Sequence, residues 1–205
     1  MKRKVTRSTS TPEGDDAGEL RSQNLLASPE QEVCQFSDLD IQSIVPCFPE
    51  NTVFHPFDPA LRSDCSSSVW VCFPATPFLL GFTYPFPKLT SDFFKITGLS
   101  FIQAMPMVWR TFFTLEEIIR SQSVDFGVSE LADVYNLVTH GSSRFVLKLK
   151  PDRSRLILKS TQNDPHWRHQ FFFVRRDSIP EGESLPRKWV TKGRIPDLYN
   201  CVCNV

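Results

Sequence analysis

A chain of 205 residues with 40% hydrophobic and 22% charged residues is long enough to bury one core, so we expect one folded domain with flanking segments. Phenylalanine accounts for 18 residues against 3 tyrosines, which favours aromatic side chains that fill a core. The longest apolar run, from Phe78 to Phe86, is interrupted by Gly81 and Pro85. It is far shorter than the roughly 20 residues that cross a bilayer, so we expect no membrane insertion.

The formal net charge is zero, but the charges are unevenly spread along the chain. Residues 1–60 carry 5 Lys and Arg against 10 Asp and Glu, residues 61–143 carry 5 against 7, and residues 144–205 carry 13 against 6. The three net charges are therefore −5, −2 and +7. A basic third of this kind is typical either of a polyanion-binding segment or of the solvated face of a sheet.

The amino-terminal segments are poor in apolar periodicity. Residues 1–32 are rich in Ser, Thr, Asp, Glu and Gly, and they cannot bury enough apolar area to offset the entropy of ordering, so we expect a disordered tail. Residues 33–68 contain Phe-Pro and His-Pro steps, which favour extended or turn geometry over helix. We expect them to form an irregular segment that wraps the edge of the domain.

The cysteines have no disulfide-framework spacing, and the amino terminus has no apolar signal-peptide core. We therefore expect an intracellular, reducing environment, with nucleus and cytoplasm both open. His166 and His169 with Cys201 and Cys203 do not match zinc-finger or knuckle spacings, so we expect no metal site. The six cysteines are Cys34, Cys47, Cys65, Cys72, Cys201 and Cys203.

The first predicted elements are a strand and two helices. Residues 69–73 form a short strand that Pro74 ends, and an aromatic loop follows. A helix is predicted over residues 88–97, with Gly98 as its terminator. Pro106 begins the second helix, in which three- and four-residue spacing of apolar residues predicts a buried stripe that includes Val108, Trp109, Phe112, Phe113, Leu115, Ile118 and Ile119.

The next predicted elements are a third helix and a hairpin. The helix runs from Ser129, a candidate N-cap, through Val138, and Gly141 ends it. The apolar period then changes to two: residues 145–149 and 156–158 alternate on either side of a Pro-Asp turn. This pattern predicts a β-hairpin.

Residues 171–174 form a further predicted strand that is apolar on both faces and therefore lies inside the sheet. The predicted fold class is α+β. A small helical layer over about residues 88–138 packs on a short antiparallel sheet. That sheet contains the hairpin and the 171–174 strand, with the 69–73 strand as a candidate further member.

An ordered set of aromatic motifs spans residues 69–190. The motifs are Trp70-Val71-Cys72-Phe73, Pro77-Phe78-Leu79-Leu80-Gly81-Phe82, Tyr84-Pro85-Phe86, Asp92-Phe93-Phe94, Pro106-Met107-Val108-Trp109-Arg110, the Trp167-to-Val174 run and Trp189. Together they resemble the gypsy-type transposon domain of plant proteins. The resemblance assigns residues 69–190 to that domain and leaves residues 191–205 as a C-terminal tail, with truncation of the chain as an open alternative.

Two positions depart from the family pattern. The family often has Leu-Arg before its Phe-Pro, where this chain reads Phe82-Thr83-Tyr84-Pro85, and Met107-Val108 stands before the tryptophan of the second helix. The apolar skeleton is kept, so the resemblance implies no charged role at these positions. It implies a retrotransposon-derived, non-enzymatic protein with a Gag-like structural or self-association role.

Catalytic motifs are missing from the sequence. It has no Asp-Ser/Thr-Gly triplet of a retroviral-type protease, no Gly-x-Ser-x-Gly elbow and no phosphate-binding loop. Its acidic residues are dispersed, whereas a polymerase or integrase assembles several of them around metal ions. We therefore expect no enzyme, no cofactor and no small-molecule substrate.

The alternative function is a basic nucleic-acid-binding module. Cationic residues along one sheet face and its turn would contact phosphates, and Trp167 or one of the phenylalanines would offer a stacking surface. The competing interpretation is a solvated sheet face that keeps a phenylalanine-rich strand soluble. The candidate RNA- or DNA-binding residues are Lys148, Lys150, Arg153, Arg155, Lys159, Arg175 and Arg176.

Overall fold

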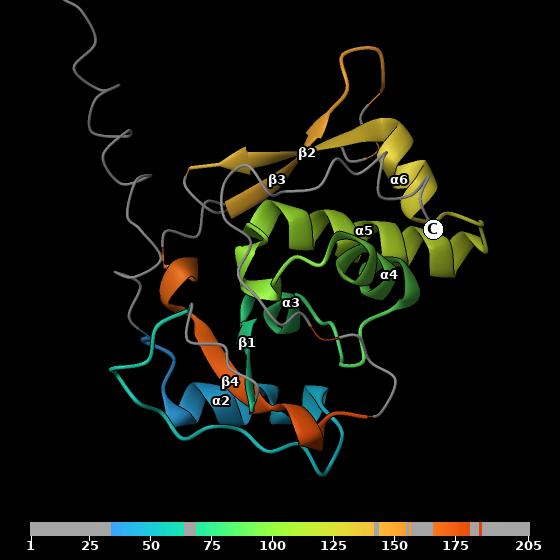
Figure 1. The fold of residues 1–205 in the computed structure, drawn as a ribbon. Coiled ribbons are helices and arrows are strands. Elements are labelled where there is room, and N and C mark those ends of the chain that lie inside the picture. The colour runs from blue at the N-terminus through green and yellow to red at the C-terminus, as the bar shows by residue number, and fades with distance from the viewer. Residues whose placement is uncertain are drawn as a thin grey trace, which may run out of the picture.

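The computed structural model describes residues 34–63, 69–141, 144–154, 156, 166–180 and 185. Within these residues the chain forms five α-helices, four short 3-10 helices and two antiparallel sheets, which confirms the α+β fold class (Figure 1). The predicted tail at 1–32 and the C-terminal tail at 191–205 lie outside the described residues.

The four strands form two separate two-stranded sheets. Strand β1 (Trp70–Pro74) pairs with β4 (Phe171–Arg175), and strand β2 (Tyr135–His140) pairs with β3 (Arg144–Leu149). The β2–β3 hairpin lies on one side of helix α5 and the β1–β4 pair on the other (Figure 1). The prediction of a single sheet is therefore wrong, although the 69–73 strand does pair with the 171–174 strand.

The predicted third helix is half helix and half strand. Helix α6 (Val128–Val134) ends where β2 begins, at Tyr135, and Gly141 turns the hairpin with a φ of 69°. Over a stretch as short as Tyr135–His140 the apolar spacing fits a helix as well as a strand. Hydrogen bonding to β3 stabilises the strand instead. The partner of β3 is therefore β2, and residues 157–158 of the predicted hairpin lie outside the described residues. Of the predicted second hairpin strand only Leu156 is described, and it is 40% exposed.

Helix α4 begins and ends, and helix α5 begins, where the sequence predicts. Helix α4 (Lys88–Thr97) ends at Gly98, which has a left-handed φ of 65° that glycine adopts at little cost. Helix α5 (Pro106–Gln122) begins with Pro106, whose missing N–H is not needed in the first turn. Trp109 is fully buried as predicted, but Phe113 is only half-buried.

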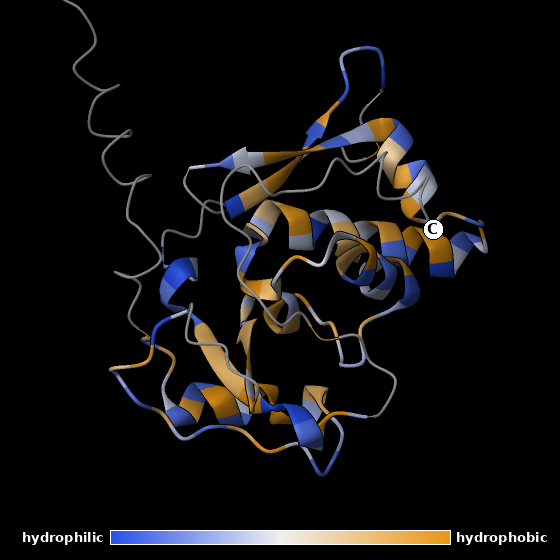
Figure 2. Cartoon of the chain, viewed as in Figure 1, coloured by the Kyte–Doolittle hydropathy of each residue, from blue (hydrophilic) through white to orange (hydrophobic). Residues whose placement is uncertain are grey.

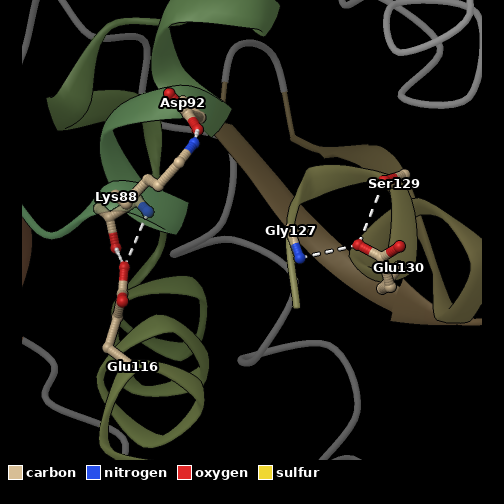
Figure 3. Close-up of polar contacts among 7 residues, drawn as sticks. Lys88, Asp92, Glu116, Gly127, Ser129 and Glu130 are labelled. Carbon is tan, nitrogen blue, oxygen red and sulfur yellow. Dashed lines mark hydrogen bonds and ion pairs between the residues drawn. The ribbon is translucent and has the colours of Figure 1, made fainter. Parts of the chain in front are cut away.

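A glutamate carboxylate caps the first turn of helix α4, and another caps the first turn of helix α6 (Figure 3). Thr90 donates its N–H and its hydroxyl to Oε1 of Glu116, at 2.9 and 3.0 Å, so α5 caps α4. At α6 the Oε2 atom of Glu130 accepts the Gly127 N–H at 2.7 Å and the Ser129 hydroxyl at 3.1 Å. These bonds lower the pKa of Glu130. The N-cap of α6 is Gly127, and the prediction of Ser129 is wrong.

The segment at 33–68 contains a helix that was not predicted. Helix α2 (Asp38–Ile44) begins with a capping box, in which the Ser37 hydroxyl accepts the Asp40 N–H at 3.3 Å and Asp40 accepts the Ser37 N–H at 2.9 Å. The rest of the segment follows the domain edge, because Phe54 forms a bridge with Val174 of β4. The aromatic loop likewise contains a short helix, α3 (Thr76–Leu79).

One aromatic core joins the two sheets. Phe172 of β4 stacks on Phe73 of β1 with ring centres 5.9 Å apart, and Phe73 lies 4.9 Å from Phe101. Phe101 lies 4.9 Å from Phe94 of α4, whose ring lies 6.4 Å from Phe145 of β3. Apolar residues run along β1 and β4 and recur along α5 (Figure 2). The high phenylalanine content is thus used largely in packing between layers.

Candidate functional site

The hairpin presents part of the predicted basic surface. Lys148 is exposed on β3, opposite Asn136 of β2. Lys150 is half-buried just after β3, and the exposed Arg153 donates from Nε to the carbonyl of Asp133 at 3.2 Å. The structure thus places three of the candidate cations at one end of the hairpin. Arg155 and Lys159 lie outside the described residues.

Arg175 and Arg176 belong to the other sheet. Arg175 ends β4, and Arg176 begins the 3-10 helix η5 (Arg176–Ser178), on the opposite side of α5 from the hairpin (Figure 1). Arg175 also forms an ion pair with Asp177, with Nε and Oδ1 2.6 Å apart. The seven candidate residues therefore do not share one sheet face, because β3 and β4 pair with different strands.

Trp167 and the phenylalanines of β4, which are part of the predicted stacking surface, are buried. Trp167, in the 3-10 helix η4 (Trp167–His169), is only 6% exposed, and the phenylalanines of β4 are buried. Two guanidinium groups lie over the Trp167 ring: that of Arg144 is 5.0 Å and that of Arg168 is 5.6 Å from the ring centre. These cation–π contacts use the ring face that a base would need. Trp167 and Phe171 to Phe173 therefore present no exposed ring face for a base, whereas Phe57 is 38% exposed.

Arg144 is the charged residue that sequence reasoning missed. It is buried, and its guanidinium donates a hydrogen bond to the carbonyl of Ile102. Burial, and to a smaller extent the nearby Arg168, lower the pKa of Arg144 to about 9. Strand alternation places Arg144 on the same face as the exposed Lys148, so the alternation predicts that Arg144 is exposed. The sequence around Arg144 therefore gives no local signal for its burial.

The remaining chemistry-bearing residues form no metal-binding cluster in the part of the chain that the structure describes. His166 is exposed and His169 is half-buried at the two ends of η4, while Cys201 and Cys203 lie outside the described residues. None of the described helices is both long and apolar enough to cross a membrane.

The strands differ in how their outer edges are covered. The outer edge of β4 is covered because the N–H of His55 bonds to the carbonyl of Phe173 at 2.9 Å and the N–H of Arg175 bonds to that of Val53 at 2.8 Å. At the outer edge of β3, near the start of the strand, the carbonyl of Phe145 accepts the N–H of Met105 at 3.2 Å. Protein main chain thus lies beside both strands.

The outer edge of β2 is open in the part of the chain that the structure describes. The N–H of Lys150 bonds to the carbonyl of Val134 at 3.0 Å, and antiparallel alternation from this pair directs the main-chain groups of Asn136 and Val138 toward β3. The N–H and carbonyl groups of Leu137 and Thr139 therefore point away from β3. Within the described residues these groups have no hydrogen-bond partner, and Thr139 is exposed.

The chain matches no known family model, no curated protein and no solved structure. The resemblance to the gypsy-type transposon domain stays a prediction. What the fold and its surfaces define is an α+β domain with a phenylalanine-rich core, a buried arginine–tryptophan contact and, among the described residues, an open outer edge on β2.

Proposed function

We propose that this protein is a non-enzymatic structural module that self-associates, and that it derives from the Gag-like region of a retrotransposon. The lineage rests on the ordered aromatic motifs of residues 69–190. The non-enzymatic role rests on the lack of protease, hydrolase and phosphate-binding motifs in the sequence.

The observation that carries self-association is the outer edge of β2, where the main-chain groups of Leu137 and Thr139 have no hydrogen-bond partner among the described residues. Large apolar side chains also lie on the surface. Leu39 of α2 is 84% exposed, Leu79 of α3 is 59% exposed and Val69 is 51% exposed. Trp167 is meanwhile buried beneath two arginines, where it cannot stack on a nucleic-acid base. Apolar surface together with a net charge of zero favours contact with another protein surface over contact with a polyanion.

Light scattering coupled to size exclusion tests the proposal on the full 205-residue chain. We expect a mass that rises with protein concentration above the 23.5 kDa of one copy. A constant mass of one copy at every concentration would contradict self-association.

The hairpin cations support a second candidate function, nucleic-acid binding. Lys148, Lys150 and Arg153 lie within six residues of one another, and Lys148 and Arg153 are exposed. If they bind phosphates, replacing all three by glutamine lowers the slope of log affinity against log salt by about one for each phosphate that is no longer bound. The matched control replaces Arg175 and Arg176 in the other sheet. Equal effects per charge of the two sets would show that the hairpin is not the binding site, and no binding by the parent at low salt would remove this function.

A further inference from the structure

We propose that the outer edge of β2 is the surface through which this protein self-associates, and that its occupant is β2 of a second copy. The two strands run antiparallel about a two-fold axis that passes by Val138. This inference rests on the proposed function, because it names the surface and the partner of the self-association.

The main-chain geometry selects the register. Leu137 and Thr139 are the β2 residues whose N–H and carbonyl groups point outward without a partner in the described part of the chain. An axis at Val138 places Leu137 of one copy opposite Thr139 of the other, and the reverse. Each such pair exchanges two hydrogen bonds, so both open residues are satisfied in both copies.

The lack of Lys, Arg, Asp and Glu in β2 favours a second copy over a charged partner. The strand reads Tyr-Asn-Leu-Val-Thr-His and contains no Lys, Arg, Asp, Glu or Pro, which are the residues that commonly block pairing at a strand edge. In the proposed register Asn136 lies opposite His140 of the other copy, so no two like charges meet. The net charge of zero also removes long-range repulsion between copies.

The same symmetry decides on which face of the shared sheet the helices of the two copies lie. A two-fold axis that relates antiparallel neighbours stands perpendicular to their sheet, so the α5 helices of both copies lie on the same face. The result is a continuous four-stranded sheet in the order β3, β2, β2 and β3. On its other face, Val138 lies beside Val138 of the second copy. This valine is half-buried within one copy, so pairing adds an apolar contact at the centre of the interface.

Cysteine cross-linking tests the register. In this arrangement Val138 and its symmetry mate form a non-hydrogen-bonded pair with Cα atoms about 4.5 Å apart, within the range that a disulfide spans. We expect Val138→Cys to form a covalent dimer under mild oxidation, with the 138–138 linkage identified by peptide mass spectrometry. Asn136→Cys is the matched control, because its symmetry mate lies about 13 Å away along the strand. Equal cross-linking of both variants, or none at position 138, would overturn the register.

Thr139→Pro tests the edge without a cysteine. Proline removes the outward N–H of Thr139 but none of the β2–β3 bonds, so the hairpin is retained. We expect it to weaken dimerisation by about ten- to a hundredfold, whereas Thr139→Val, which keeps the N–H, changes it little. A dimer that neither Thr139→Pro nor Val138→Cys affects would refute the β2 edge and leave self-association standing. A parent chain that is monomeric at every concentration would refute both proposals.

Discussion

The guanidinium of Arg144 lies 5.0 Å from the centre of the Trp167 ring, and this contact connects the hairpin to the segment that leads into β4. Arg144 begins β3, and Trp167 begins η4, the short helix that precedes β4 in the chain. The same guanidinium bonds to the carbonyl of Ile102, so one side chain ties three segments together. The planar, multiply donating guanidinium suits this role in a way that an ammonium group does not.

Arg144→Lys should lower the free energy of unfolding by about 1–3 kcal/mol, because lysine cannot both reach the Ile102 carbonyl and cover the Trp167 ring. Urea unfolding followed by tryptophan fluorescence measures the change. Arg168→Lys is the matched control. It removes a guanidinium that lies 5.6 Å from the same ring but is only half-buried, so we expect a smaller effect. A larger effect at Arg168 would show that Arg144 is not the connecting residue.

Trp109→Ala should cost about 3–5 kcal/mol, because it empties a fully buried aromatic site. The indole stacks on Phe94 at 5.1 Å, and its Nε1 has no hydrogen-bond partner among the described residues, so the loss is one of apolar packing. Met107→Ala, on the exposed side of the same helix, is the control and should stay within about 0.5 kcal/mol. Similar melting temperatures for the two variants would contradict this packing.

Glu116→Ala should destabilise the protein by about 0.5–2 kcal/mol, because α4 loses the carboxylate that caps its first turn. A double-mutant cycle with Thr90→Val measures the coupling between the two side chains. Glu117→Ala is the control on the neighbouring position of α5. Glu117 forms an exposed ion pair with Arg120, so its loss should change stability little. Additive effects of the Thr90 and Glu116 changes would argue against the cap.

Glu130→Ala should destabilise the protein at neutral pH, and this effect should disappear in acid. The pKa of Glu130 is lowered in the folded state, chiefly by the bond from the Gly127 N–H. A lowered folded-state pKa means that the stabilisation is present above the ordinary glutamate pKa and is lost as the pH falls through the folded-state pKa. Thermal melts across that range measure the difference from the parent. Glu130→Gln, which accepts the same bond without titrating, should show a much weaker dependence on pH.

The end of α4 and the start of α5 could be predicted from the sequence. Gly98 ends α4 and Pro106 begins α5 because a left-handed φ and a missing N–H are properties of those residues themselves. The capping box of α2 also has a local signal, the Ser-x-x-Asp spacing of Ser37 and Asp40, although the Pro steps around it favour irregular structure.

The candidate site was predictable only in part. The exposure of Lys148 followed from alternation with buried Leu147. The separation of Lys148 from Arg175, and the burial of Arg144 against Trp167, did not follow from any pattern within one strand. Each depends on which strands lie side by side and on what covers their faces.

The sequence by itself determined the helices α4 and α5, the apolar strands and the use of phenylalanine in the core. Only the tertiary structure decided that Tyr135–His140 is a strand, that it pairs with β3, and that β1 and β4 form a separate sheet. The physical reason is the range of the hydrogen bonds. A helix bonds each residue to one four positions away, so the local sequence determines where it forms. Strand β1 instead bonds to β4, about a hundred residues further along the chain, and no local spacing specifies that pairing.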